Sequence, residues 1–205
     1  MGVYRRFVLP WVVHLACGSR PVMEQRAKVI PAARGRVLEI GIGSGLNLPL
    51  YDTGAVERVV GVEPSPEMTR MAARAAARSA IDVELVSAVS EEIPLDRHGF
   101  DTVVTTYTLC TIPDAVRALR EMARVLKPGG RLLFCEHGLA PDAGVRRWQN
   151  RVNPLWQRIG GGCNLNRDIP ALLRRGGFAI ERIDTAYVTG WRPASFTYWG
   201  SAVVG

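Results

Sequence analysis

The stretch VLEIGIGSG, residues 37 to 45, decides the fold of this chain. It begins as a short apolar run of the kind that forms a buried strand, and it ends in Gly41, Gly43 and Gly45. Without side chains, the backbone can turn tightly there and lie against a ligand at the carboxyl edge of a sheet, where open α/β sheets bind their ligands. The stretch therefore predicts a strand, a glycine loop and a ligand site, in that order.

The spacing of the glycines separates two kinds of nucleotide site. The dinucleotide fingerprint needs its third glycine five positions after the first, where this chain has Leu46, so NAD is the weaker interpretation. Glu39 stands two residues before the first glycine of the loop. Glu63 ends the next predicted strand, where a carboxylate can accept hydrogen bonds from both hydroxyls of a ribose.

The rest of the chain alternates strand and helix patterns, which is typical of a doubly wound sheet. Ser65 is a good N-cap for a helix to about Ser79, and a second helix is expected from about Pro113 to Leu126. Two late strands with a short connection should form an antiparallel hairpin at one sheet edge. The predicted strands are residues 36–41, 58–63, 82–88, 100–106, 131–136, 178–186 and 196–204.

We therefore predict one α/β domain over residues 1–205, with a seven-stranded, mostly parallel sheet, an antiparallel C-terminal strand and helices on both faces. Residues 1–32 are expected to form a helical cap, because the apolar run after Arg6 is too short for a membrane span. Residues 139–176 are expected to form an insertion or lid. Its helix should carry an apolar face made of Val145, Trp148, Val152, Leu155, Trp156 and Ile159, which would cover the core, close over a substrate or contact a membrane surface.

Composition excludes several classes of function. The net charge of +7 comes from basic residues scattered along the chain, without the clustered stripe expected of a nucleic-acid surface. The four cysteines form no CxxC pair and no Cys/His cluster at zinc-ligand spacing, so no metal site is predicted. They are expected to be reduced thiols of a cytoplasmic protein.

Three segments together carry a resemblance. The ExGxGxG pattern from Glu39, the stretch FDTVVTTYTLCTIPD at 100–114 and ALREMARVLKPGGRLLFCEHG at 118–138 resemble the motifs of Rossmann-like class I S-adenosylmethionine-dependent methyltransferases. The resemblance implies S-adenosylmethionine as cofactor and S-adenosylhomocysteine as product. It assigns cofactor binding to Glu39, Gly41, Gly43, Gly45, Asn47, Glu63, Pro64, Met68, Ala88 and Thr106.

The fourth predicted strand ends in Thr106-Tyr107-Thr108, which lacks the NPPY tetrapeptide of enzymes that methylate nucleic-acid bases. A methyltransferase needs a base only when its acceptor must lose a proton, as a thiol does. His137 follows the fifth strand on the side of the predicted cofactor pocket and is our preferred base or orienter. Tyr107 and Glu136 are the alternatives.

A closer resemblance covers most of the chain. WQNRVNPLWQRIGGGCNLNR at 148–167 and the final YWGSAVV look like the methyltransferase-like family whose mammalian members sit on membranes and methylate small thiols. It implies a small, partly apolar acceptor, with Cys163 and Arg167 in the characteristic segment and a weak membrane-surface contact. A lipid headgroup amine or a quinone as acceptor, and a cofactor sensor without transfer activity, are the alternative hypotheses.

Overall fold

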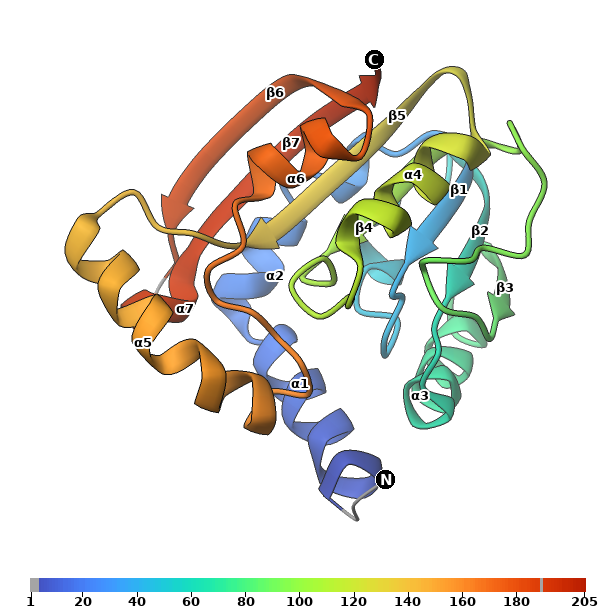
Figure 1. The fold of residues 1–205 in the computed structure, drawn as a ribbon. Helices are drawn as coiled ribbons and strands as arrows, with labels where there is room; N and C mark the ends of the chain where they lie inside the picture. The colour runs from blue at the N-terminus through green and yellow to red at the C-terminus, as the bar shows by residue number, and fades with distance from the viewer. Residues whose placement is uncertain (1–3, 189) are drawn as a thin grey trace.

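The computed structural model describes residues 4–188 and 190–205, so residues 1–3 of the predicted cap lie outside the described residues. The described residues form one seven-stranded sheet in the order β3-β2-β1-β4-β5-β7-β6 (Figure 1). The first five strands are parallel, and β7 is antiparallel to both of its neighbours. The strands are β1 Gly35–Ile40, β2 Val56–Val62, β3 Asp82–Val86, β4 Phe100–Thr106, β5 Leu126–His137, β6 Phe178–Tyr187 and β7 Phe196–Val204.

Helices cover both faces of this sheet, as predicted. Leu38 of β1 packs on one face in a cluster with residues of α4 (Ala115–Val125) and α6 (Ile169–Arg175). Val37, the preceding residue, packs on the other face with Ala72 of α3 (Pro66–Ala76). Since successive side chains of a strand point to opposite faces, both helical layers follow from the continuous apolar strands.

The caps of these helices are close to the predicted positions. Ser65 caps α3 by accepting a hydrogen bond from the backbone N–H of Met68 at 3.3 Å. Asp114 caps α4, and that helix ends at Val125. Strand β5 begins at Leu126, earlier than the predicted residue 131, and its register against β4 shifts between Phe100 and Thr102. A glycine pair and a proline at an irregular strand start explain the difference.

The N-terminal segment begins near the carboxyl ends of the strands and then passes along one face of the sheet, where Ile30 packs (Figure 1). It consists of a π-helix, Tyr4–Val8, the helices α1 Leu9–Cys17 and α2 Arg20–Arg26, and a short 3-10 turn, Ile30–Ala32. A second 3-10 turn, Leu48–Leu50, follows the glycine loop. Among the residues that the structure describes, no helix combines the length and apolarity needed to cross a bilayer.

The insertion forms helix α5 (Ala143–Ile159), and its apolar face is only partly turned inward. Trp148, Leu155 and Ile159 are 59%, 63% and 49% exposed, whereas Gln149 and Asn153 are buried. The Gln149 amide explains the orientation: its Nε2 lies 2.9 Å from the carbonyls of Gly138, Leu165 and Pro193, the last in α7 (Arg192–Ser195). Buried backbone carbonyls need donors, so a polar face turns inward and leaves apolar side chains outside.

Candidate functional site

The glycine loop lies between β1 and the N-terminus of α3, at the carboxyl edge of the sheet. Gly41 has a φ of 65°, and a Cβ atom there would lie 2.4 Å from Thr108 Cγ2. Gly43 also has a positive φ, 58°, but a Cβ there would meet no protein atom nearer than Met68 Cε at 3.7 Å. Gly41 is therefore required for packing within the protein, and Gly43 is the position that leaves its backbone open to a ligand.

Glu63 holds this loop to the start of α3. Its carboxylate oxygens accept hydrogen bonds from the backbone N–H groups of Gly43 at 3.1 Å and Ser65 at 2.9 Å. Burial raises the pKa of Glu63, and these two hydrogen bonds act in the opposite direction. Each carboxylate oxygen can accept more than one hydrogen bond, so Glu63 retains acceptor capacity for a ribose beside Gly43.

Glu39, Asn47 and Thr106 lie together in a buried polar network beneath the loop. Asn47 Nδ2 donates to Glu39 Oε1 at 2.8 Å and to Thr106 Oγ1 at 3.0 Å, while the Tyr51 hydroxyl donates to Glu39 Oε2 at 2.8 Å. Sequence analysis missed a further member, Arg26 of α2, whose guanidinium donates to Asn47 and Thr106. Arg26 carries no local sequence signal, since only the folded chain brings α2 against the glycine loop.

Burial raises the pKa of Glu39 from its ordinary value of 4.5 to about 7, against hydrogen bonds from Tyr51 and Asn47 that lower it. The folded chain therefore retains a proton that the unfolded chain releases above pH 4.5. We expect wild-type stability to fall, relative to Glu39→Gln, by up to about 3 kcal/mol as the pH rises through this window. Urea unfolding of both proteins at pH 5 and pH 8 measures this change in the free energy of unfolding. An equal change in wild type and Glu39→Gln would contradict the prediction.

The remaining predicted cofactor residues line the other side of the loop. Met68 lies in the first turn of α3 with its methyl group facing Gly43, and Pro64 is exposed between Glu63 and that helix. Ala88 is half-buried after β3, packed against the core. Of these three residues, Met68 is the one in contact distance of the glycine loop.

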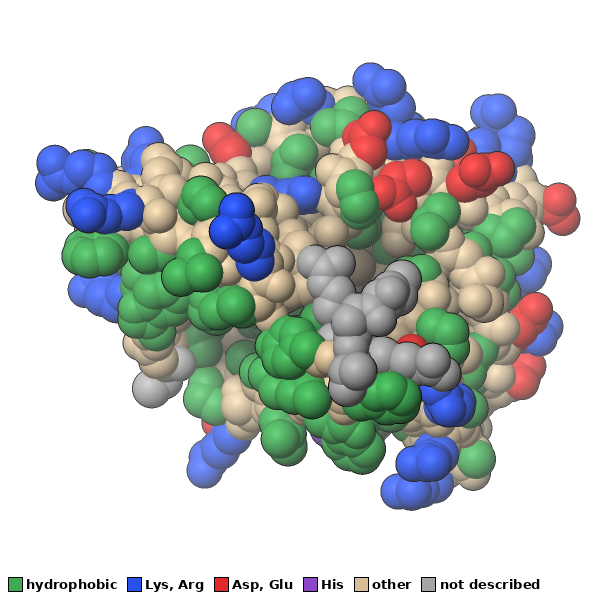
Figure 2. Space-filling model, turned by 60° about the horizontal axis from the view of Figure 1, so that its bottom comes forward, with side chains coloured by type: hydrophobic (Ala, Val, Ile, Leu, Met, Phe, Trp, Pro, Cys, Tyr) green, Lys and Arg blue, Asp and Glu red, His purple; other side chains and the backbone are tan. Residues whose placement is uncertain are grey.

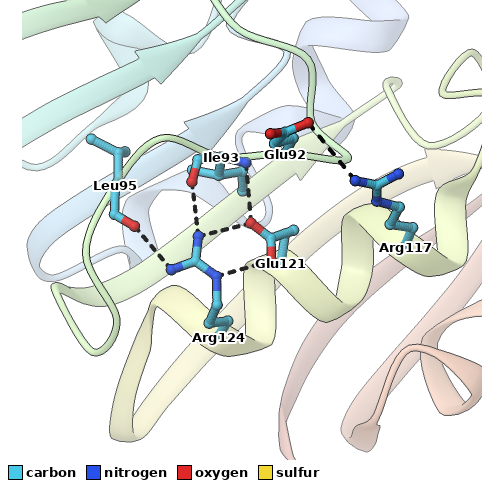
Figure 3. A network of polar contacts seen from close by, with 6 residues as sticks. All are labelled: Glu92, Ile93, Leu95, Arg117, Glu121 and Arg124. Atoms are coloured by element: carbon cyan, nitrogen blue, oxygen red, sulfur yellow. Dashed lines mark hydrogen bonds and ion pairs between the residues drawn. The ribbon is translucent and has the colours of Figure 1, made fainter.

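An ion-pair network anchors the segment that follows Ala88 (Figure 3). The Arg124 guanidinium of α4 donates to the carbonyls of Leu95 at 2.9 Å and Ile93 at 2.8 Å. Glu121 pairs with Arg124 at 2.7 Å and accepts from the Ile93 N–H at 3.1 Å. Hydrogen bonding to Arg124 holds the pKa of Glu121 below its ordinary value.

Arg124→Ala is expected to lower the free energy of unfolding by about 1–2 kcal/mol, because two loop carbonyls lose charged donors. Affinity for S-adenosylmethionine should fall several-fold as the loop after Ala88 loosens. Arg117→Ala is the matched control, since the Arg117 guanidinium forms an exposed 3.8 Å pair with Glu92 and contacts neither loop carbonyl (Figure 3). Chemical denaturation and calorimetric titration measure both effects; equal results for the two variants would exclude the anchoring role.

Glu136 has a structural task that occupies both of its oxygens. It is fully buried and accepts hydrogen bonds from Thr105 Oγ1 at 2.8 Å and from the backbone N–H groups of Thr108 at 2.9 Å and Leu109 at 3.2 Å. The carboxylate therefore fixes the turn that follows β4. This geometry disfavours Glu136 as a base for an external acceptor.

His137 and Tyr107 lie side by side at the carboxyl ends of β5 and β4. Their rings stack at 6.3 Å with an interplanar angle of 21°. Tyr107 has a φ of 54°, a conformation that a bulky side chain rarely adopts and that is frequent at functional sites. Burial raises the pKa of Tyr107 further above its ordinary value of 10, so the hydroxyl stays protonated at neutral pH and can donate but not abstract a proton.

The fold also gathers sulfur atoms around His137. Its Nε2 lies 3.3 Å from Cys163 Sγ, and Cys110 completes a group whose donor atoms all lie within 4.8 Å of one another. Arg167, which donates to the Leu109 carbonyl, is half-buried and close enough to Cys110 and Cys163 to interact with them electrostatically. The sequence spacing predicted no such cluster, because the end of β5 and the segments after β4 and α5 contribute to it.

S-adenosylmethionine fits the residues present on the glycine-loop side. Gly43 leaves space that a side chain would fill, Glu63 offers acceptors for ribose hydroxyls, and the buried Arg26 Nε has no hydrogen-bond partner within the described residues. A buried donor without a partner is costly, which is consistent with a ligand group there. The fold and this loop define a class I S-adenosylmethionine-dependent methyltransferase.

Comparison with known proteins gives the family. Residues 38–134 match the methyltransferase domain family model. The chain is 35% identical over 183 residues to the thiol S-methyltransferase TMT1B of Homo sapiens, covering 86% of this chain and 74% of that protein. For TMT1B of Rattus norvegicus the identity is 31% over 166 residues, covering 79% of this chain and 65% of that protein. The chain belongs to the S-adenosylmethionine-dependent methyltransferase family that contains these proteins.

Two further relatives define the breadth of the similarity. A phosphatidylethanolamine N-methyltransferase of Cereibacter sphaeroides is 35% identical over 128 residues, 62% of each chain. Among solved structures, a SAM-dependent methyltransferase of Thermotoga maritima superposes with a TM-score of 0.66 at 22% identity, covering 98% of both chains. The structural match confirms the predicted fold class, and family and fold together imply S-adenosylmethionine as the cofactor.

Proposed function

We propose that this chain transfers the methyl group of S-adenosylmethionine to a small, partly apolar thiol. The observation that carries the proposal is the position of His137, 3.3 Å from a thiol sulfur at the carboxyl edge of the sheet. That sulfur belongs to Cys163, and the contact indicates that the imidazole can lie against a thiol group. The similarity to two proteins named as thiol S-methyltransferases supports the same acceptor.

S-adenosylmethionine supplies an electrophilic methyl group on its sulfonium. Glu63 is proposed to hold the ribose, and Arg26, which forms no ion pair within the described residues, to hold the carboxylate of the methionine part. The acceptor sulfur forms the new S–C bond, the sulfonium C–S bond breaks with its electron pair returning to the cofactor sulfur, and the thiol proton leaves. His137 promotes that loss of the proton, and Arg167 favours the resulting thiolate by its charge.

A thiol acceptor predicts a specific effect of His137→Gln. We expect kcat/KM for a small thiol to fall at least about 100-fold, because the group that assists ionisation of the thiol is removed. S-adenosylmethionine affinity should be unchanged, since the glycine loop is untouched. His98→Gln is the control, because His98 lies before β4 at the opposite end of the strands. Full thiol turnover in His137→Gln would exclude a role of His137 in the reaction.

A lipid headgroup amine is the second candidate acceptor. Phe7, Trp11 and Leu15 of the N-terminal segment are 57%, 55% and 70% exposed, and Figure 2 shows hydrophobic side chains gathered on this face with Lys and Arg around them. Such a surface suits contact with a bilayer. The phosphatidylethanolamine N-methyltransferase among the relatives supports the same alternative.

The experiment that separates these functions is product formation with labelled S-adenosylmethionine. Small alkyl thiols, phosphatidylethanolamine vesicles and quinols are each offered to the full chain, with controls that lack acceptor or enzyme. Turnover on thiols is the expected result. Turnover on lipid or quinol alone would show that the acceptor is not a thiol. Tight cofactor binding without any turnover would favour a sensor.

A further inference from the structure

We propose that Cys110, His137 and Cys163 form a binding site for a thiophilic divalent metal ion such as Zn²⁺, with an open fourth position for the acceptor thiol. Thiolate sulfur and imidazole nitrogen are the ligands that zinc prefers, and catalytic zinc sites combine three protein ligands with one exchangeable position. The inference rests on the proposed function for the identity of the fourth ligand. The metal site itself rests on the geometry of the three side chains.

The distances suit a tetrahedral ion with little movement. Zinc lies about 2.3 Å from sulfur and about 2.0 Å from nitrogen, which places tetrahedral ligands about 3.5–3.8 Å apart. His137 Nε2 and Cys163 Sγ are 3.3 Å apart, and all three donor atoms lie within 4.8 Å of one another. Shifts of about 1 Å or less in the three side chains would therefore bring their donor atoms to the distances that coordination requires.

The two cysteine loops are held together by their backbones. The N–H of Asn164 and its side-chain Nδ2 both donate to the Cys110 carbonyl at 2.9 Å. Glu136 fixes the same turn from the other side through the N–H groups of Thr108 and Leu109. This arrangement places the cysteine side chains before any ion binds, which reduces the ordering cost of coordination.

His137 is incompletely satisfied without a further ligand. It is more than nine-tenths buried, and its Nε2 faces only the Cys163 thiol, which is a weak hydrogen-bonding group. A metal–nitrogen bond would offset the cost of burying such an imidazole. The buried Nε2 atom thus gains a stronger partner when an ion binds.

The electrostatics and the access route agree with this site. Two thiolates balance the charge of one divalent ion, and Arg167 lies close enough to both cysteines to compensate a third, incoming thiolate. An open cavity of about 530 Å³ lies beside the cluster, lined in part by Thr111, Gly162 and Asn164, the sequence neighbours of the two cysteines. Protons released by the two cysteines and by the acceptor can leave through it.

The site assigns a definite task to His137. As a ligand through Nε2, it would assist ionisation of the acceptor thiol by holding the ion that binds the thiolate, instead of accepting the proton itself. The acceptor sulfur would keep a lone pair directed toward the cofactor methyl group. Loss of turnover in His137→Gln is expected in either case, so the test requires a direct readout of the metal.

The test is titration of the reduced, chelator-treated full chain with Co²⁺, followed by competition with Zn²⁺. We expect thiolate-to-cobalt absorption that saturates at one ion per chain, and a Zn²⁺ dissociation constant that rises at least about 100-fold in Cys110→Ala and in Cys163→Ala. Cys135→Ala, which alters a buried cysteine of β5 outside the cluster, should bind like wild type. Circular dichroism of each metal-free variant confirms its fold.

Absence of thiolate-to-cobalt absorption in the folded wild type, or unchanged Zn²⁺ affinity in both cysteine variants, would overturn the metal site. Thiol methylation is then measured with and without chelator. Metal binding without turnover on any thiol would refute the proposed function and leave the site standing. Equal thiol turnover in chelated and Zn²⁺-loaded enzyme would overturn the role of the ion in acceptor binding and leave the proposed function standing.

Discussion

Glu63→Ala is expected to raise the dissociation constant for S-adenosylmethionine at least about 100-fold. The carboxylate accepts from the N–H groups of Gly43 and Ser65, and it is the proposed acceptor for the ribose hydroxyls. Hydrogen bonds to a charged group contribute about 1.5–3 kcal/mol each, and loss of two corresponds to about 100-fold or more in affinity. Isothermal titration calorimetry of the full chain measures this loss.

The matched control is Glu57→Ala, which removes an exposed glutamate near the start of β2, the strand that Glu63 follows. Its affinity should equal that of wild type. An affinity of Glu63→Ala within threefold of wild type would exclude the ribose assignment. Loss of both affinity and folded structure would show instead that Glu63 acts mainly by fastening the glycine loop, and Glu63→Gln, which keeps one acceptor oxygen, then separates the two roles.

The second large effect concerns Glu136. Glu136→Ala is expected to lower the free energy of unfolding by about 3–5 kcal/mol, because the buried N–H groups of Thr108 and Leu109 lose their acceptor and a cavity remains. Glu136→Gln keeps the shape and one oxygen, so its loss should be smaller. Urea unfolding measures both, with Glu181→Ala on β6, an exposed glutamate, as control. A loss below about 1 kcal/mol would mean that other acceptors reach those amides.

Sequence patterns were sufficient to predict the sheet and the glycine-loop side of the site. The strand positions, the Ser65 cap and the Gly41 turn depend on local chemistry, because periodicity and glycine spacing are visible in short windows. The structure brings Gly43 and Glu63 into contact as their positions after two adjacent parallel strands implied. The family resemblance supplied the name of the cofactor.

The acceptor side depends on contacts between distant segments and was not predictable in the same way. Cys110, His137 and Cys163 follow different elements, so no spacing rule joins them. Arg26 enters the glycine-loop network only because α2 packs there. The amphipathic pattern of α5 left open what its apolar face covers, and the orientation follows instead from the buried carbonyls around Gln149, which required a polar group on the inward side.

The placement of β7 has a consequence for how the chain is made. It follows every other strand in the sequence, yet it lies between β5 and β6 and pairs with both. During synthesis, β5 therefore keeps a free row of backbone N–H and C=O groups until residue 204 has left the ribosome. An unpaired apolar edge is a template for association with other chains, so the nascent protein depends on protection of β5 until its final partner arrives.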